Sequence, residues 1–233
     1  MSKRVNVLLL GLMMCASGYA FSPQRIDEND SLIFLQKNSY VVFYNIDRQI
    51  PALVAWNLTE RNLGRWHRPS NVSFRQDVNC PKPRAKAQNF VNTGYQRGHL
   101  CPSADRSADN TQMRATFVMS NVAPMTAVLN TVQWAQAEDY SRCLTRYGHE
   151  CHMMAGAFLS DSAQMLSMSS MIHVPDSFFR ACIVHDAPQL SVYWLMANDT
   201  IRRSETACRV GRSRFLMSLR KKVRMIFDNL DTL

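Results

Sequence analysis

Gly94-Tyr95-Gln96-Arg97-Gly98-His99-Leu100 places an arginine and a histidine on either side of a glycine. A second group follows farther along the chain, in the order Ser120-Asn121-Val122-Ala123-Pro124, Asn130, Trp134 and Glu138. The Arg-Gly-His tripeptide alone is a weak signal, because a structural histidine beside a surface arginine explains it equally well. Together with an asparagine and a glutamate on an expected helix, it predicts a site for a histidine base, a phosphate and one hard metal ion. Those are the requirements of phosphodiester chemistry.

His99 is the candidate general base of this site. The pKa of an unperturbed histidine is about 6.5, so a neutral imidazole can accept a proton at physiological pH. Gly98 allows a tight backbone geometry and the close approach of a bulky phosphate. Arg97 carries a planar guanidinium whose donors match phosphate oxygens. These three residues predict proton abstraction beside a bound phosphate.

Residues 126–146 contain neither glycine nor proline, which predicts a helix with Thr126 as its N-cap. Asn130, Trp134 and Glu138 recur every four residues and therefore share a face of that helix. We expect Trp134 to pack in the core and to fix how the helix sits. Asn130 and Glu138 carry oxygen ligands of the kind that a hard cation such as Mg²⁺ prefers.

The spacing assigns different roles to the two oxygen ligands. At about 1.5 Å per residue, the α-carbons of Asn130 and Glu138 are separated by roughly 12 Å along a helix axis. Direct metal bonds of about 2.1 Å from both side chains would strain that geometry. We therefore expect Asn130 to bind the Mg²⁺ directly and Glu138 to act through a metal-bound water. A single neutral protein ligand would leave the ion strongly polarising toward the phosphate.

The chain has 233 residues without an internal repeat or a Gly/Ser-rich linker, which predicts one domain over residues 21–233. Residues 1–20 read as a secretory signal, in which two basic residues precede an apolar run and Gly18-Tyr19-Ala20 forms the cleavage site. A membrane anchor would need about 20 apolar residues, more than this run contains. A lipoprotein signal ending at Cys15 is a weaker alternative, because Met14 is bulky. We expect a secreted or periplasmic protein.

Outside the expected signal the cysteines form an even set, as in exported proteins with disulfides: Cys80, Cys101, Cys143, Cys151, Cys182 and Cys208. These six residues predict up to three disulfides, with the pairing open. A zinc site at His149-Glu150-Cys151-His152 is the alternative. Its ligands are crowded and no Cys-x-x-Cys pair accompanies them, so disulfides are favoured.

The basic charge is concentrated near the C-terminal end. The formal net charge is +9, and residues 202–224 contain nine basic side chains against Glu205 alone. Within the basic segment 202–227, residues 212–227 read as an amphipathic helix whose apolar stripe comprises Phe215, Leu219, Val223 and Ile226. A polyanionic partner is expected, either nucleic acid or an acidic membrane surface reached through the 212–227 helix. A solvated basic face would show the same pattern.

Predicted strands and helices alternate in an irregular order. Residues 39–46 and 52–58 read as a hairpin of two core strands, and the polar, proline-containing residues 61–84 as a long loop. Further strands are predicted at residues 116–119, 153–158, 178–184 and 190–196. This order favours an α+β fold over a doubly wound sheet.

The chain resembles the DNA/RNA non-specific endonuclease family, the secreted sugar-non-specific nucleases of the ββα-metal (His-Me finger) superfamily. The motifs that carry the resemblance are residues 95–105, 116–117, 120–124 and 130–142, and it extends over residues 39–196. It implies an α+β fold with a central antiparallel sheet, flanking helices and a ββα-metal finger active site. It also implies a secreted Mg²⁺-dependent endonuclease, with Mn²⁺ as a substitute, that hydrolyses phosphodiester bonds of DNA and RNA.

By matching position, the resemblance assigns roles to the candidates. His99 would be the general base, Asn130 the magnesium ligand and Glu138 the organiser of metal-bound water. Asn121 would support the site by hydrogen bonding.

Arginines and the residue before Arg97 complete the expected substrate contacts. Arg97 would contact the phosphate, and the family places another arginine in the loop after the second strand, where Arg68 matches better than Arg65. Gln96 replaces the usual aspartate, and Met125 stands where glutamine is often found. Gln96 could still hydrogen-bond a metal-bound water, so we expect altered activity or metal affinity rather than loss. A catalytically impaired protein that binds nucleic acid without cutting it is the alternative.

Overall fold

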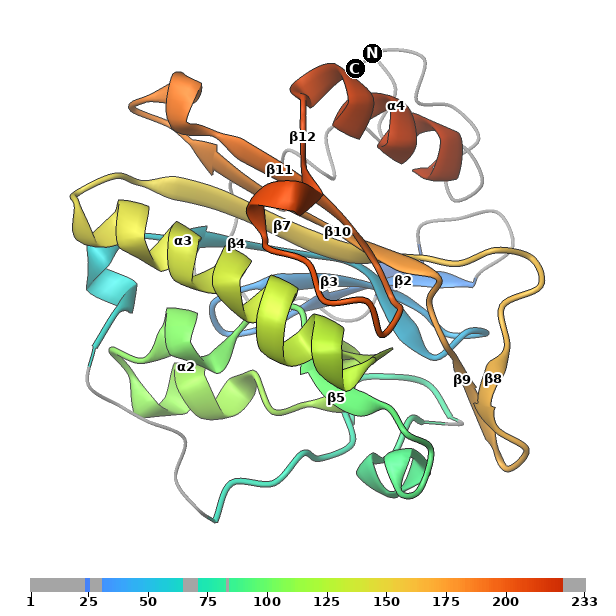
Figure 1. The fold of residues 1–233 in the computed structure, drawn as a ribbon. Coiled ribbons are helices and arrows are strands. Elements are labelled where there is room, and N and C mark those ends of the chain that lie inside the picture. The colour runs from blue at the N-terminus through green and yellow to red at the C-terminus, as the bar shows by residue number, and fades with distance from the viewer. Residues whose placement is uncertain (1–23, 26–30, 65–70, 83, 224–233) are drawn as a thin grey trace.

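The computed structural model describes residues 24–25, 31–64, 71–82 and 84–223 (Figure 1). The expected signal, residues 1–20, lies outside the described residues, as do the candidate arginines Arg65 and Arg68 and the end of the basic segment beyond residue 223.

A large antiparallel sheet forms the centre of the fold. Within the described residues it has eight strands in the order β1-β2-β3-β4-β7-β10-β11-β12. Their bounds are β1 Gln24–Arg25, β2 Leu32–Gln36, β3 Val41–Asn45, β4 Ile50–Leu58, β7 Cys151–Phe158, β10 Ser177–Val184, β11 Val192–Ala197 and β12 Arg209–Val210. Two small hairpins stand apart from it, β5 Gln96–His99 with β6 Val122–Met125 and β8 Met165–Ser167 with β9 Ser170–His173. The predicted α+β fold with a central antiparallel sheet is confirmed.

The helices within the described residues are few and lie on both faces of the sheet. They are α2 Asn110–Ala115, α3 Trp134–Arg146 and α4 Arg212–Val223, and a π-helical turn, η5 Leu129–Gln133, leads into α3. Short 3-10 turns occupy the connections: η1 Glu60–Asn62, η2 Ala87–Phe90, η3 Ser103–Arg106, η4 Met119–Asn121, η6 Pro188–Leu190 and η7 Thr206–Cys208. None of the described helices combines the length and the apolar composition that a membrane crossing requires.

The predicted core hairpin is present as β3 and β4. Val41 pairs with Ala55 and Val42 with Val54, as β-branched residues at a buried pleated surface favour. The strand β4 starts earlier than expected, at Ile50, because the turn before it closes at Gln49 with a left-handed φ of 50°.

The strand predicted at residues 116–119 is wrong. Thr116 caps the end of α2, and Val118 makes only an isolated parallel bridge to Arg75. Asn121 lies in the 3-10 turn η4 that follows. The apolar residues of this segment are buried by packing against a loop rather than by pairing in the sheet, so their composition alone misled the prediction.

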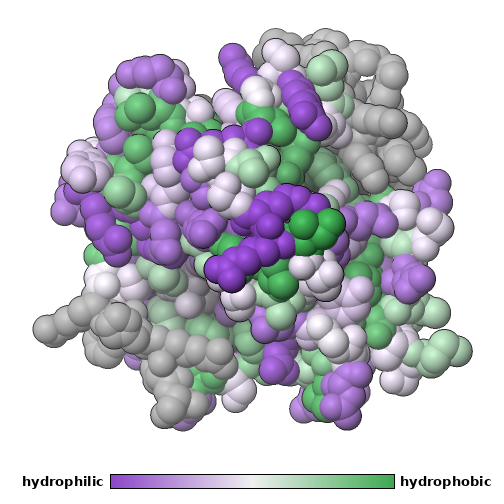
Figure 2. All heavy atoms as spheres, in the orientation of Figure 1, coloured by the Kyte–Doolittle hydropathy of each residue, from purple (hydrophilic) through white to green (hydrophobic). Residues whose placement is uncertain are grey.

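The two faces of the sheet carry different partners. Alternate residues of β10 point to opposite faces: Phe178 packs in the core with Trp134 of α3, whereas Phe179 packs with Phe215 of α4. Figure 1 accordingly shows α4 across the sheet from α2, α3 and β5. The surface over α3 is mostly polar (Figure 2). The basic helix α4 and the Arg97–His99 strand therefore lie on opposite sides of the sheet.

Candidate active site

The predicted ββα finger is formed by β5, β6 and the helix that ends with α3. β5 and β6 are antiparallel, with Gln96 opposite Met125 and His99 opposite Val122. The helix follows directly, and the Thr126 hydroxyl accepts a hydrogen bond from the Leu129 amide at 3.3 Å, as an N-cap does. The sequence motif and its helix are thus brought together by short, local connections.

Gly98 is needed for packing inside the hairpin. A Cβ at this position would lie 2.3 Å from Sδ of Met125, a buried side chain on the facing strand. The expected reason for this glycine was the approach of a phosphate. The structure shows that the space beside its α-carbon is filled by Met125.

The imidazole of His99 sits between two aromatic rings. Its centroid is 4.8 Å from the Phe74 ring and 4.8 Å from the Phe117 ring, which meets it edge-on. The backbone carbonyl of His99 accepts a hydrogen bond from Nε1 of Trp134 at 3.1 Å. Trp134 is buried in the core and positions the helix, as predicted. The base candidate is therefore held through its ring and through its backbone.

Asn121 is fully buried and hydrogen-bonds only to the backbone in the contacts described. Its Oδ1 accepts from the Cys101 amide at 2.9 Å, and its Nδ2 donates to the carbonyls of Cys101 and Thr116 at 2.9 and 3.0 Å. Its own carbonyl accepts from the Leu100 amide at 3.0 Å. Asn121 thus fixes the two residues after His99 and acts through them.

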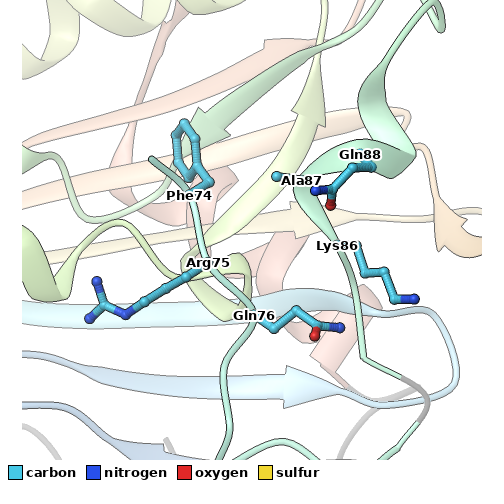
Figure 3. Close-up of a pocket in the computed structure, with 6 residues that line it drawn as sticks. All are labelled: Phe74, Arg75, Gln76, Lys86, Ala87 and Gln88. Atoms are coloured by element: carbon cyan, nitrogen blue, oxygen red, sulfur yellow. The ribbon is translucent and has the colours of Figure 1, made fainter. Parts of the chain in front are cut away.

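Arg97 lies on the surface next to the histidine. Its guanidinium is centred 5.3 Å over the Phe74 ring, and Nη1 donates to the Ala87 carbonyl at 3.2 Å. A hollow of about 550 Å³ adjoins these contacts (Figure 3), lined by Phe74, Arg75, Gln76, Lys86, Ala87 and Gln88. Phe74 and Ala87 both line the hollow and contact Arg97. A basic and amide-rich depression therefore borders the histidine and arginine.

Asn130 lies in the π-helical turn and meets Gln96 of β5. Its Nδ2 donates to Oε1 of Gln96 at 2.7 Å. No hydrogen bond or ion pair within the described residues joins Asn130 to Glu138, in agreement with the axial separation expected from sequence. The π-helical turn itself was not predicted, because it is built from residues that an ordinary α-helix accepts equally well.

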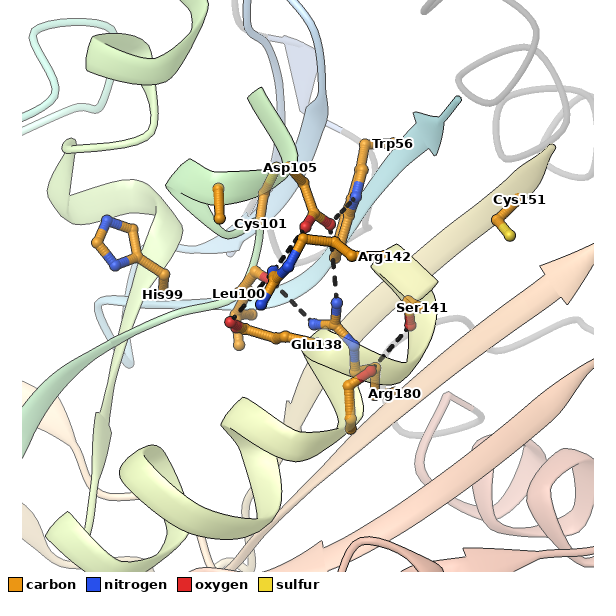
Figure 4. A network of polar contacts seen from close by, with 12 residues as sticks. Trp56, His99, Leu100, Cys101, Asp105, Glu138, Ser141, Arg142, Cys151 and Arg180 are labelled. Atoms are coloured by element: carbon orange, nitrogen blue, oxygen red, sulfur yellow. Dashed lines mark hydrogen bonds and ion pairs between the residues drawn. The ribbon is translucent and has the colours of Figure 1, made fainter. Parts of the chain in front are cut away.

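Glu138 lies near Arg142 on the next turn of α3 (Figure 4), with its carboxylate 3.7 Å from Nη1. Burial raises the pKa of Glu138 to about 7, although Arg180 and Arg142 pull it in the opposite direction. At neutral pH the carboxyl is therefore close to the midpoint between its protonated and ionised forms. A cation nearby would favour the ionised form.

A buried ionic network behind the finger escaped the sequence analysis. Asp105 is fully buried and accepts from Nε1 of Trp56 at 3.0 Å and from Nη1 of Arg142 at 2.9 Å. Arg180 lies 3.9 Å from the same carboxylate, and its Nη1 donates to the Leu100 carbonyl at 3.4 Å. The network (Figure 4) connects the sheet, α3 and the residue after His99. Its signal in the sequence was a charged Arg180 within an otherwise apolar predicted strand.

The donors of the finger fit a hard cation. Within the described residues no hydrogen bond reaches Oδ1 of Asn130, and the Glu138 carboxylate, farther along the same helix, could hold a water of the ion. No group of three or more His, Cys, Asp or Glu side chains gathers around one point in the described ranges. The cation site would thus rest on few protein donors, which suits an ion that keeps most of its water.

The zinc alternative at residues 149–152 is not supported. Cys151 is buried, while the neighbouring His152 hydrogen-bonds with Asn57 on the adjacent strand. His149 pairs with Asp186 instead. The side chains of this tetrapeptide therefore diverge.

All six cysteines outside the expected signal are free thiols in this structure. Cys143 is exposed on α3, and the other five, Cys80, Cys101, Cys151, Cys182 and Cys208, are buried. Cys151 and Cys182 lie on the paired strands β7 and β10 and contact each other through their thiols. The disulfides predicted from the even cysteine count are not formed in this structure, and their pairing stays a prediction.

Known proteins are similar to this chain in sequence. The model of the DNA/RNA non-specific endonuclease family matches residues 20–225. A nuclease from Nostoc sp. is 32% identical over 167 residues, which cover 71% of this chain and 59% of that protein. Human mitochondrial endonuclease G is 27% identical over 161 residues, which cover 65% of this chain and 54% of that protein. The chain thus spans little more than half the length of these two relatives.

A solved structure has the same fold. EndoG, in its complex with EndoGI, superimposes with a TM-score of 0.71 at 18% identity, over 95% of this chain and 90% of that one. The family match covers most of the sequence and includes the whole ββα finger. The chain belongs to the DNA/RNA non-specific endonuclease family.

Proposed function

We propose that this protein is a Mg²⁺-dependent endonuclease that hydrolyses phosphodiester bonds in both DNA and RNA. One observation carries the proposal. His99 and Asn130 lie on the same ββα finger, and each is tied to another element of it, the His99 carbonyl to Trp134 and the Asn130 amide to Gln96. A finger without a catalytic task would not need both residues held in this way.

His99 acts as the general base in this proposal. Its neutral imidazole removes a proton from the attacking water, and the rings of Phe74 and Phe117 limit how far it can turn. Arg97 is two residues away on the same strand, so its side chain shares the face of the hairpin with His99. Its guanidinium donates to phosphate oxygens and offsets the charge that develops on them.

Asn130 would hold the divalent cation through Oδ1, with Mg²⁺ as the proposed ion and Mn²⁺ as a substitute. When bound, such a cation would neutralise charge on the phosphate and stabilise the leaving oxygen. Glu138 would contribute through a water molecule rather than directly. Arg142, beside the Glu138 carboxylate, limits the direction from which that carboxylate can be approached.

The hollow beside Arg97 is the proposed path of the nucleic acid away from the scissile bond. Arg75 and Lys86 would contact phosphates there. The family resemblance also assigns a phosphate contact to Arg68, which lies outside the described residues. Phosphate contacts depend neither on the base nor on the 2′-hydroxyl, so DNA and RNA would both be substrates.

Export is part of the proposal, because residues 1–20 have the form of a secretory signal. In an oxidising compartment we propose that Cys151 and Cys182 form a disulfide. Cys151 pairs with Val184 and Cys182 with Met153, so the two thiols lie diagonally on one face of the sheet. Peptide mapping of the exported protein without reductant tests this pairing, and finding both thiols alkylated would refute it.

The helix α4 is the candidate contact with an acidic surface on the other side of the molecule. Leu216 and Met217 are 41% and 64% exposed beside the exposed Arg212 and Arg214. Phe215, on the apolar stripe predicted from sequence, packs against Phe179 and Tyr193 of the sheet. Flotation of liposomes rich in anionic lipid, with the full chain and with a chain ending before Arg212, tests a membrane role. Equal flotation excludes it.

The catalytic proposal is tested by incubating supercoiled plasmid and single-stranded RNA with the wild type and with His99→Ala. With Mg²⁺ the wild type is expected to nick the plasmid and degrade the RNA. EDTA and the substitution should each abolish both activities. Intact nucleic acid after incubation with folded wild type would instead favour the binding-only alternative.

A further inference from the structure

Gln96 and Asn130 meet at the centre of the finger although they belong to different elements. Gln96 is the first residue of β5, and Asn130 lies in the π-helical turn before α3. Nδ2 of Asn130 donates to Oε1 of Gln96 at 2.7 Å, and both side chains are only partly exposed. The contact therefore joins the residue that departs from the family motif to the residue that carries the cation ligand.

This hydrogen bond determines which way the Asn130 amide faces. A primary amide has a donor end and an acceptor end on the same planar group, and rotation by half a turn exchanges them. Gln96 carries the same kind of amide, and in this structure its acceptor end, Oε1, faces Asn130 and places the Asn130 nitrogen on that side. With Nδ2 bound to Oε1 of Gln96, Oδ1 must point to the other side, where a cation or its water can be bound.

The hairpin fixes the backbone of Gln96 and thereby places its side chain next to Asn130. Gln96 pairs in register with Met125, which is fully buried and fills the space beside Gly98. Met125 also departs from the family pattern. The two departures are thus direct cross-strand neighbours, and the apolar Met125 leaves Asn130 as the hydrogen-bond partner of the Gln96 side chain.

Gln96 orients Asn130 without adding charge. A carboxylate in the same place could accept the same hydrogen bond, and its negative charge would also attract a cation bound at Asn130. The amide provides the orientation alone. Orientation and charge are therefore separable at this position by substitutions of matching length.

We propose that Gln96 is a positioning residue for the divalent cation. Gln96 holds Oδ1 of Asn130 toward the ion. Because it carries no charge, the affinity for the ion is lower than it would be with a carboxylate at the same position. The inference rests on the proposed function, because it takes Asn130 as the cation ligand. It adds that the cation requirement of this enzyme is set by a residue that does not itself bind the ion.

The test is a Mn²⁺ titration at pH 8, followed by electron paramagnetic resonance and by calorimetry, on the full chain and three variants. Gln96→Met keeps the length and removes the acceptor. Gln96→Glu keeps the length and the acceptor and adds a charge. Asn130→Ala removes the proposed ligand. Circular dichroism melts establish that each variant is folded, and Gln96→Ala replaces Gln96→Met if the latter is not.

We expect Gln96→Glu to bind Mn²⁺ more tightly than the wild type, and the wild type to bind it more tightly than Gln96→Met. The loss in Gln96→Met should be about five- to tenfold, the size expected for one lost orienting hydrogen bond. Wild-type affinity in Gln96→Met, or affinity in Gln96→Glu as low as in Gln96→Met, would overturn the inference. Unchanged binding by Asn130→Ala would instead overturn the cation site of the proposed function, so the two failures are distinguishable.

Discussion

His99 depends on its neighbours for a defined position, because an imidazole on a two-stranded hairpin is otherwise free to rotate. The Phe74 and Phe117 rings restrict the side chain, and Asn121 fixes the segment that follows it. Their effect on His99 does not require contact with the reacting phosphate. The position of the His99 imidazole is thus fixed by residues that are not themselves reactive and that a search for reactive side chains does not identify.

The role of Asn121 can be measured as stability. Asn121→Ala would leave the amide of Cys101 and the carbonyls of Cys101 and Thr116 without their partner in a fully buried place. We expect a loss of about 3 kcal/mol in the free energy of unfolding, because unsatisfied buried groups cost about 1–3 kcal/mol each. Urea denaturation gives the value. Asn79→Ala, at an exposed side chain, is the control and should change it little. An equal loss in the free energy of unfolding for Asn121→Ala and Asn79→Ala would contradict this role for Asn121.

Residues of the finger could be predicted from sequence because they are close in the chain. Arg97, His99 and Asn130 lie on a hairpin and the helix that follows it, so their order and spacing carry the information. Phe74 and Arg180 come from distant segments, and their contacts depend on the packing of the whole domain. No spacing rule connects them to His99. Arg68 could be assigned only by resemblance and lies outside the described residues.

At the scale of elements, α3 is joined to β5 through one indole. Trp134→Phe would keep an aromatic ring in the core and remove the donor to the His99 carbonyl. We expect about a tenfold lower rate of plasmid nicking with about 1 kcal/mol less stability, since a net hydrogen bond contributes about that much. Initial rates and urea denaturation measure the two effects.

The control is another buried indole with a similar hydrogen bond. Trp194 on β11 donates to Glu205 at 2.8 Å, away from the finger. Trp194→Phe should lose similar stability and retain the nicking rate. A comparable loss of activity in both variants would mean that Trp134 matters only for folding.

Elements differed in how well the sequence predicted them. The hairpin of β3 and β4 was predicted because its β-branched and aromatic residues match a buried sheet. Residues 116–119 have a similar composition, yet they pack against a loop, so burial without pairing was read as a strand. The helix of the finger was predicted, but its π-helical start was not. That start places Asn130 opposite Gln96, which is a tertiary contact.

At the scale of the whole molecule, two basic regions lie on opposite faces of the sheet. Arg75 and Lys86 line the hollow beside Arg97, whereas Arg212 and Arg214 are exposed on α4. The exposed Arg212 and Arg214 of the basic segment therefore lie on the side away from the proposed active site. Charge content alone did not locate the substrate surface.

Two double substitutions distinguish the contributions of these two basic regions to DNA binding. The double substitution Arg75→Ser and Lys86→Ser should weaken DNA binding. It should also make the slope of log K, where K is the association constant for DNA, against the logarithm of salt concentration shallower by about two, since each phosphate contact contributes about one to that slope. The matched pair Arg212→Ser with Arg214→Ser removes the same charge and should leave the slope unchanged. Binding of labelled duplex to a His99→Ala background, measured from 50 to 200 mM salt, tests both. Equal slopes for the two pairs would contradict the assignment of the substrate path.

Asp77 connects distant parts of the molecule and should give stability a specific pH dependence. Burial would raise the pKa of Asp77, but the ion pair with Lys37 and the hydrogen bonds from Lys37, Ser120 and Asn79 outweigh it and lower the pKa below 3.8. A lowered folded-state pKa stabilises the protein above the unfolded pKa, near 3.9, and this contribution is lost as the pH falls through the folded value.

Asp77→Asn is therefore expected to be less stable than the wild type at pH 7, by about 1–3 kcal/mol for a buried paired carboxylate. The difference should shrink as the pH falls below 4, because the carboxyl of the unfolded wild type becomes protonated first and that of the folded protein at still lower pH. Urea denaturation of both proteins at pH 7 and pH 3 measures it. A difference that is the same at both pH values would rule out the ionised carboxylate as its source.

The central claim is that His99 removes the proton from the attacking water within the slot formed by Phe74 and Phe117. His99→Gly leaves that slot open to a free imidazole, so the lost base can be supplied in solution. The measurement is the initial rate of plasmid nicking by folded His99→Gly with Mg²⁺ as imidazole is added. We predict a rate at least about a hundredfold below the wild type without imidazole, and a rise with imidazole concentration. A His99→Gly variant that nicks as fast as the wild type in the absence of imidazole would contradict the account.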